Sequence, residues 1–369
     1  MFRFRHPSRR FGFAPPDIPP RVNRRPAPSA ARPAAVGARA PAQILTMSDI
    51  PSADTKSILR RAVEMKTTPD LFQQAYHHRV VAFVTDAPSI RTELSFQAAL
   101  MQLGAHAMRF NLEYYANDIH GATLPEVGDI CGTYADLVVC GMQENRDLMT
   151  FRDNCPKPIV NAEDSRANPC QTLADLMTIE ERKGDLAGLK IAYLGDVTRN
   201  SAQDLMRAGC ALSMQVMMAA NPSQPSDYPE NVPQALRDES EALSAQGPGC
   251  AVYVDSVEAA VREADVIYVE KWVTYDPSES TEGATETWAN GSTPMLKAEP
   301  RMTLQEVESM IDTAAPDVLF MHCLPSRRLL GSAAPQIEGS DSIFRSQVVN
   351  RLYVQKSLLV HMLAARSMT

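Results

Sequence analysis

The sequence lacks any long uninterrupted apolar run. No stretch of its 369 residues approaches the roughly 20 apolar residues that a membrane-spanning helix requires, so we expect no membrane partner. It also has no Cys-x-x-Cys pair. The seven cysteines are scattered, which argues against a disulfide framework or a zinc site and favours a reducing compartment. The formal net charge of −8 does not favour a nucleic-acid partner.

Lysine is absent from residues 1–46, which contain nine arginines, nine prolines and one acidic residue, Asp17. We predict a disordered extension, because so many prolines cannot sustain a helix and no hydrophobic periodicity is present. Two other interpretations stay open. An Arg-rich, acid-poor segment is typical of mitochondrial targeting peptides, although Pro-Pro at 15–16 and 19–20 argues against the amphipathic helix that such peptides form. Alternatively, translation begins at Met47. Of the two locations, we favour a cytoplasmic protein over a mitochondrial one.

The rest of the chain alternates between short Val-rich runs and stretches of helical periodicity. The predicted strands are 79–84, 106–110, 137–140, 158–161, 190–194, 214–220, 266–269 and 318–322. The predicted helices are 55–77, 92–103, 171–182, 202–211 and a long amphipathic one at 349–365. Such alternation predicts parallel sheets that are covered by helices on both faces.

Length and composition favour two domains, because 369 residues with 44% hydrophobic content can bury a sizeable core. The stretch Gly184–Leu189 resembles a boundary between two α/β units. We predict an α/β fold with two doubly wound parallel-sheet domains and the active site in the cleft between them. The predicted division is an extension at 1–46, a first domain at 47–185 plus 345–369, and a second domain at 186–344.

A Ser-Ile-Arg-Thr sequence, residues 89–92, opens the helix that follows the first predicted strand. Free N–H groups and the helix dipole make such a helix start an anion-binding site. The hydroxyls of Ser89 and Thr92 and the guanidinium of Arg91 add donors that suit a phosphate. The plainer interpretation is that Ser89 only caps the helix and Arg91 is a solvated surface residue.

A second motif, Met321-His322-Cys323-Leu324-Pro325, ends the last predicted strand. Ligands of open α/β sheets bind at the carboxyl ends of strands, where exposed carbonyls are able to accept hydrogen bonds from a substrate amine. The alternative is a buried structural cysteine in front of an ordinary loop.

A third motif, Asn168-Pro169-Cys170-Gln171, leads into the helix at 171–182. Proline near a helix start is structurally ordinary, so this motif alone is a weak signal. Asn168 and Gln171 are nevertheless able to present amides to one ligand.

Taken in order, these motifs resemble the aspartate/ornithine carbamoyltransferase family over about residues 55–365. The matching blocks are Pro88–Thr92 with Ser95-Phe96, Asn168–Leu176, Leu194–Asp196 with Asn200, His322–Pro325, and Asn350–Leu352 with Gln355-Lys356. Members of this family transfer the carbamoyl group of carbamoyl phosphate to an amine. They have two doubly wound domains and form trimers whose sites use neighbouring subunits.

The resemblance implies a homotrimer that acts on carbamoyl phosphate and an amino acid, with no metal and no organic cofactor. Residues 47–185 plus 345–369 would bind carbamoyl phosphate, and residues 186–344 would bind the amino acid. The implied carbamoyl-phosphate contacts are Ser89, Ile90, Arg91, Thr92, Asn168, Gln171, Cys323, Leu324 and Arg351, with Arg91, Cys323 and Arg351 as catalytic residues. The implied amine-substrate contacts are Asn200, Glu270, Lys271, Trp272 and Arg328.

Several positions depart from the family pattern. Asn168 stands where the family has His, and Gly141 stands where it has an Arg that helps to hold carbamoyl phosphate; Arg146 is a possible substitute. The Ser-Met-Gly element of ornithine enzymes is missing after Glu270. The Lys271-Trp272 pair is instead similar to members that act on N-acylated ornithine or on unusual substrates.

We therefore predict carbamoyl transfer to an ornithine-like, N-acylated or otherwise atypical amino acid. One alternative is a catalytically weakened paralogue with a binding or assembly role, and another is an enzyme that uses a different acyl-phosphate donor. A nicotinamide dehydrogenase is disfavoured, because no G-x-G-x-x-G follows the strand at 190–194.

Overall fold

The computed structural model describes residues 43–86, 89–112, 121–220, 232–270, 304–322 and 343–364. The predicted extension therefore lies outside the described residues, except at its end. There Gln43–Ile44 forms strand β1, Ile44 and Leu45 are buried, and the ordered chain begins before residue 47. The boundary at residue 46 was wrong because two residues are too short for a periodicity signal, and the pairing of β1 with a distant strand orders them.

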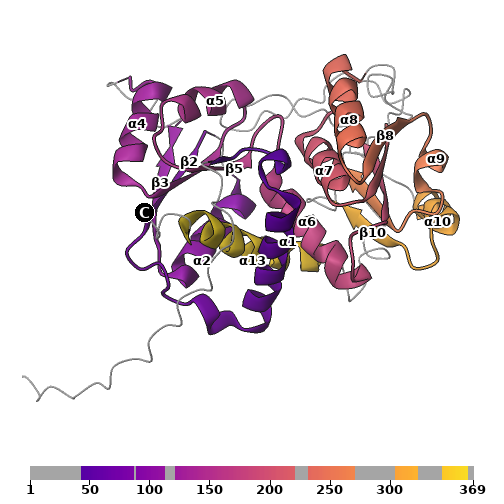
Figure 1. The fold of residues 1–369 in the computed structure, drawn as a ribbon, viewed down its shortest axis with the longest axis horizontal. Coiled ribbons are helices and arrows are strands. Elements are labelled where there is room, and N and C mark those ends of the chain that lie inside the picture. Colours follow the sequence, from indigo (N-terminus) through magenta and orange to yellow (C-terminus); the bar gives the residue numbers. More distant parts are fainter. Residues whose placement is uncertain are drawn as a thin grey trace, which may run out of the picture. The chain divides into compact units, whose positions relative to one another are not determined.

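The first sheet has five parallel strands in the order β1-β5-β4-β2-β3. Figure 1 labels β2, β3 and β5 of this sheet. Its strands after β1 are β2 (Val80–Thr85), β3 (His106–Asn111), β4 (Leu137–Gly141) and β5 (Ile159–Glu163). The helices of this part are α1 (Ser52–Thr67), α2 (Ile90–Leu103), α4 (Leu124–Tyr134), α5 (Asn145–Asp153) and α6 (Pro169–Lys183). Two short 3-10 helices are η1 (Met47–Asp49) and η2 (Pro69–Phe72).

The second sheet also has five parallel strands, in the order β10-β9-β6-β7-β8. They are β6 (Lys190–Gly195), β7 (Gln215–Ala219), β8 (Cys250–Val254), β9 (Val266–Glu270) and β10 (Leu319–His322). The accompanying helices are α7 (Asn200–Ala211), α8 (Gln234–Gln246), α9 (Val257–Val261) and α10 (Leu304–Thr313). The predicted fold class, α/β with two parallel sheets, is confirmed. Within the described residues, no helix combines the length and apolarity needed to cross a bilayer.

Two helix predictions need correction. The helix predicted at 55–77 ends at Thr67, because Pro69 lacks an N–H and restrains the residue before it; η2 follows. The last helix, α13 (Ile343–Ala364), is not amphipathic in its second half, where every residue from 354 to 363 is buried. Helix α13 packs against α1, α2 and α6, and we propose on this basis that residues 345–369 belong to the first domain.

Both sheets bring chemically useful positions to the carboxyl ends of neighbouring strands. In the first sheet, β2 lies between β3 and β4, and Thr85 pairs with Gly141, which pairs with Glu163. In the second sheet, β6 lies between β7 and β9, and Gly195 pairs with Glu270. At such points, successive connections leave in opposite directions, and the crevice that results is where ligands of open α/β sheets bind.

Gly195 is required by the close approach of β6 and β9. Its φ is +129°, and a Cβ built on it would lie 1.8 Å from the carbonyl oxygen of Glu270. A side chain at this position would force the two strand ends apart. The residue therefore fixes the position of the Glu270 backbone relative to the loop that leads into α7.

We expect Gly195→Ala to lower the free energy of unfolding by about 3 kcal/mol or more, through backbone strain and steric overlap. The matched control is Gly184→Ala, where φ is +89° but no atom lies within 4 Å of the added Cβ, so only about 1–2 kcal/mol should be lost. Urea denaturation measures both. Equal losses in the two variants would contradict the proposed crowding at Gly195.

Candidate functional site

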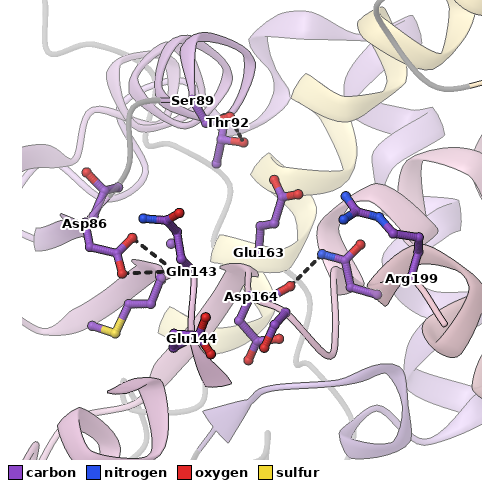
Figure 2. A pocket seen from close by; sticks show the side chains of 13 residues that line it. Asp86, Ser89, Thr92, Gln143, Glu144, Glu163, Asp164 and Arg199 are labelled. Atoms are coloured by element: carbon purple, nitrogen blue, oxygen red, sulfur yellow. Dashed lines mark hydrogen bonds between the residues drawn. The ribbon is translucent and has the colours of Figure 1, made fainter. Parts of the chain in front are cut away.

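A pocket of about 470 Å³ lies at the carboxyl ends of the first sheet (Figure 2). We call it the strand-end pocket. Its walls come from the ends of β2, β4 and β5, the start of α2 and the loop before α7. The lining residues are Thr85, Asp86, Ser89, Thr92, Gly141, Met142, Gln143, Glu144, Glu163, Asp164, Ser165, Arg199 and Asn200.

A second pocket, of about 410 Å³, is lined mainly by α2 and α13. We call it the helix pocket. Its lining residues are Ile90, Arg91, Leu94, Ser95, Ala98, Gln171, His322, Gln347, Val348, Arg351 and Leu352. The residues predicted to hold carbamoyl phosphate are thus divided, because Ser89 and Thr92 line one pocket whereas Ile90, Arg91, Gln171 and Arg351 line the other.

Arg351 links the two pockets. It is buried, and its Nη2 donates to Oγ1 of Thr92 at 2.8 Å while its Nη1 donates to Oε1 of Gln171. Oγ1 of Thr92 also accepts a hydrogen bond from the Ser89 hydroxyl at 3.0 Å. Four of the predicted residues, from three separate helix regions, therefore form one hydrogen-bonded cluster. Burial lowers the pKa of Arg351 below its usual value.

Asp175 fixes the Gln171 side chain of this cluster by a hydrogen bond. This residue was not predicted from the sequence. Its Oδ1 accepts from Nε2 of Gln171 at 2.9 Å and from Nε2 of Gln347 at 2.8 Å, and its Oδ2 accepts from the Tyr268 hydroxyl at 3.0 Å. Because Asp175 takes the amide nitrogen of Gln171, the amide oxygen faces Arg351. The available signal was the spacing of Gln171 and Asp175, four residues apart on one helix face.

The start of α2 is not closed by a simple side-chain cap. Ser89 occupies the N-cap position, but its side chain makes no capping hydrogen bond and donates to Thr92 instead. The N–H groups of the first turn are therefore not used by Ser89. Ile90 points outward with 74% of its surface exposed, as expected for a residue that contributes only its backbone.

The side chains of two predicted contact residues form hydrogen bonds with the protein backbone. Oδ1 of Asn168 accepts from the Gln171 N–H at 3.1 Å and so caps α6, and Asn168 lines neither pocket. Asn200 lines the strand-end pocket, but its side chain donates to the carbonyl of Asp164 and accepts from the Ser201 N–H. The amide of Asn168 thus has a structural explanation where the family has a histidine.

Glu270 also lies outside both pockets. Its Oε2 accepts hydrogen bonds from the hydroxyls of Tyr193, at 3.1 Å, and Ser201. Its Oε1 is 4.0 Å from Nε of Arg199, which lines the strand-end pocket. The predicted residues Lys271, Trp272, Cys323, Leu324 and Arg328 lie outside the described residues.

The structure leaves room at Gly141, where the family pattern has an arginine. A Cβ at this position would meet only Cγ2 of Thr85, at 3.5 Å. Arg146 does not fill this space, because its side chain is 86% exposed, lies 3.6 Å from Asp147 and lines neither pocket.

The strand-end pocket is acidic, a property that the sequence motifs did not predict. Four of its lining residues carry a carboxylate, namely Asp86, Glu144, Glu163 and Asp164, and one, Arg199, carries a guanidinium. Burial raises the pKa of Asp86, although the Gln143 N–H opposes the shift. Cationic groups gather instead around the helix pocket, where Arg91 and Arg351 lie.

Comparison with known proteins gives consistent matches over both halves of the chain. Residues 42–181 match the sequence model of the aspartate/ornithine carbamoyltransferase carbamoyl-P binding domain, and residues 187–362 match that of the Asp/Orn binding domain. The chain is 31% identical to an ornithine carbamoyltransferase of Parafrankia sp., over 86% of this chain and 94% of the relative. It is 28% identical to that of Listeria monocytogenes, over 88% and 96%. The solved ornithine carbamoyltransferase of Pyrococcus furiosus superimposes with a TM-score of 0.70 at 25% identity, covering 88% of this chain and 98% of that one.

Asp175 predicts a pH dependence of stability. Burial raises its pKa from 3.8 to about 6, against three hydrogen bonds that lower it. Because the folded-state pKa lies above the unfolded one, the contribution of Asp175 is fully present below about pH 4 and is lost as the pH rises to about 6. Across this window, the stability of the wild type relative to Asp175→Asn should fall by an amount on the order of 1–3 kcal/mol.

Urea denaturation of both proteins between pH 3.5 and 7.5 measures this difference. Asp204, whose pKa burial also raises to about 6, is present in both proteins, so its contribution cancels. A difference that does not change with pH would contradict the assignment.

Proposed function

The chain belongs to the aspartate/ornithine carbamoyltransferase family, and from this premise we propose that it transfers the carbamoyl group of carbamoyl phosphate to the amine of an ornithine-like, N-acylated or atypical amino acid. The observation that carries the proposal is the cluster of Ser89, Thr92, Gln171 and Arg351 at the start of α2. These are residues that the family resemblance assigns to the donor site.

On the donor side, the free N–H groups of the α2 start and the hydroxyls of Ser89 and Thr92 would bind the phosphate, together with Arg91. Arg351 would donate to the carbamoyl oxygen. This role is supported by its Nε, which is buried and has no hydrogen-bond partner among the described residues. We propose the further donor-site contacts that the resemblance implies, which are Asn168, Gln171, Cys323 and Leu324.

The reaction requires a neutral amine to attack the carbamoyl carbon while negative charge gathers on the carbamoyl oxygen and phosphate leaves. Donors that are fixed before the reaction stabilise this charge without reorganising. Thr92, Gln171 and Asp175 would hold Arg351 in this way, and the binding of both substrates in one site would supply much of the remaining acceleration.

On the acceptor side, Asn200, Glu270, Lys271, Trp272 and Arg328 remain our proposed contacts. The absence of Ser-Met-Gly after Glu270 favours an acceptor other than plain ornithine. A panel of amines, including N-acylated ornithines, should identify the acceptor when carbamoyl-phosphate-dependent phosphate release is measured.

A second candidate is a weakened paralogue with a binding or assembly role. The replacement of the family arginine by Gly141 and the acidic lining of the strand-end pocket favour it. It would bind carbamoyl phosphate but release no phosphate with any amine in the panel.

The six cysteines of the described residues are unpaired, which supports our proposal of a reducing, cytoplasmic location.

For the proposed enzyme, Arg91→Ala should lower kcat/KM by an amount equivalent to about 3 kcal/mol or more, because a donor to the phosphate is lost. Most of the loss should appear when carbamoyl phosphate is the varied substrate. Arg146→Ala is the control and should keep wild-type kinetics, since this side chain is 86% exposed and lines neither pocket. Unchanged kinetics in Arg91→Ala would refute the role of Arg91.

We also propose a homotrimer, in accordance with the family. Three large apolar side chains of α2, those of Ile90, Leu94 and Met101, are 61–75% exposed, and Met108 on the edge strand β3 is 39% exposed. Exposed apolar groups gathered on one helix and the neighbouring sheet edge are typical of a surface that another subunit covers.

Met101→Glu should therefore dissociate the assembly, because it places a charge in an apolar contact without lining either pocket. Sedimentation velocity should show trimers for the wild type and a shift toward monomers for the variant. Tyr134→Glu on α4, at a residue that is 70% exposed, is the control and should remain trimeric. A monomeric wild type, or a trimeric Met101→Glu, would be evidence against this interface.

A further inference from the structure

Glu163 is the last residue of β5 and lies at the point where three strand ends meet. In the sheet register it pairs with Gly141, which pairs with Thr85 on the other side. All three residues line the strand-end pocket. Figure 2 shows the Glu163 carboxylate extending into the pocket, away from the neighbouring side chain of Asp164.

Glu163 differs from the other carboxylates of the pocket in its hydrogen bonds. Asp164 accepts from the N–H groups of Arg166 and Ala167 and from the Asn145 amide. Asp86 accepts from the Gln143 N–H with both oxygens. Glu144 is exposed at the rim. The half-buried carboxylate of Glu163, by contrast, has no hydrogen bond or ion pair within the described residues and so is available to a ligand.

A second polar group in this pocket also lacks a partner. The side chain of Thr85 is 2% exposed, and its Oγ1 makes no hydrogen bond within the described part of the chain. A buried hydroxyl without a partner carries a free-energy cost unless a ligand or water completes it. Gly141 leaves open space beside the methyl group of Thr85, since an added Cβ would come no closer than 3.5 Å to its Cγ2. The pocket is thus both hollow and incompletely hydrogen-bonded at Glu163 and Thr85.

The charge of the pocket indicates which ligand would complete it. Four carboxylate residues and one arginine line the pocket, so its Glu163 side favours a cation. The described residues contain no group of three or more His, Cys, Asp and Glu side chains arranged to hold a metal ion. An ammonium group remains, because it carries positive charge and donates hydrogen bonds to a carboxylate and to a hydroxyl.

We propose that Glu163 binds the ammonium group of the acceptor substrate and takes one of its protons. This inference rests on the proposed carbamoyl transfer. In the first step an N–H bond of the ammonium group breaks and an O–H bond forms on Glu163, which leaves a lone pair on nitrogen. The nitrogen then attacks the carbamoyl carbon, the C–O bond to phosphate breaks, and phosphate leaves with the bonding electrons. The departing phosphate takes the second proton from the new C–N group.

The location of Glu163 fits this role. Thr92, which lines the same pocket, accepts a hydrogen bond from Arg351. Arg351 also donates a hydrogen bond to Gln171. An amine at Glu163 would therefore lie on the acidic side of this cluster, whereas the donor anion would lie on the side of Arg91 and Arg351. Opposite charges on the two sides would orient the two substrates toward each other.

The test compares the wild type with Glu163→Gln, which keeps the shape of the side chain and removes its charge. We expect the KM for the amine to rise at least tenfold and kcat to fall, while the KM for carbamoyl phosphate changes by less than twofold. The pH optimum should rise by about one unit or more, since free amine must then come from solution. Glu163→Asp, which keeps the carboxylate, should restore part of the activity at the wild-type pH optimum.

Glu241→Gln, at an exposed position on α8, is the matched control and should behave as the wild type. Circular dichroism and sedimentation confirm that each variant is folded and assembled. Wild-type KM, kcat and pH profile in Glu163→Gln would overturn the inference, as would an equal loss of affinity for both substrates.

Calorimetry with pentylamine, a plain alkylammonium ion, separates this inference from the proposed function. Binding to the wild type that weakens at least tenfold in Glu163→Gln supports the ammonium site, even if the wild type releases no phosphate with any amine. That combination would overturn the carbamoyl transfer and the proton-transfer step with it. No pentylamine binding to an active wild type would overturn the ammonium site alone.

Discussion

The described structure depends on the burial of one guanidinium. Arg351 lies on α13 with 5% of its surface exposed, and a buried charge is tolerated only when partners compensate for its lost hydration. Thr92 of α2 and Gln171 of α6 provide this compensation. The three helices must therefore meet at a fixed point, and the start of α2, where free N–H groups are available, is held beside a cation.

This requirement extends into the second sheet. Asp175 fixes Gln171 and also accepts from the Tyr268 hydroxyl on β9. The Tyr268 ring stacks on Tyr193 of β6, with the centroids 5.7 Å apart, and the Tyr193 hydroxyl donates to Glu270. A continuous series of contacts thus joins the α2 start to the end of β9. The same series of contacts therefore positions Arg351 on α13 and Glu270 on β9.

Local sequence signals predicted the parts of this structure that local physics determines. Apolar runs identified eight of the ten described strands, since a buried parallel strand is apolar on both faces, but they did not identify β8. They gave no indication of β1, which exists only because β5 offers it an edge. Gln171 and Arg351 were found through ordered motifs, but Asp175 and Glu163 were not. Their roles follow from a partner, or from the lack of one, that only the folded chain brings near.

The departures from the family pattern acquire a physical meaning when they are considered together. Asn168 keeps the α6 start capped without supplying a titratable group, and Gly141 removes a cation while it opens space beside Thr85 and Glu163. The change at Gly141 makes the Glu163 side of the strand-end pocket less able to hold a dianion and better able to hold an ammonium group, whereas Asn168 lines neither pocket. A donor anion must then depend more heavily on Arg91, Arg351 and the α2 start. We infer that the acidic pocket and the basic cluster represent a separation of the two substrates by charge, with Thr92 at the boundary, rather than the decay of an ancestral anion site.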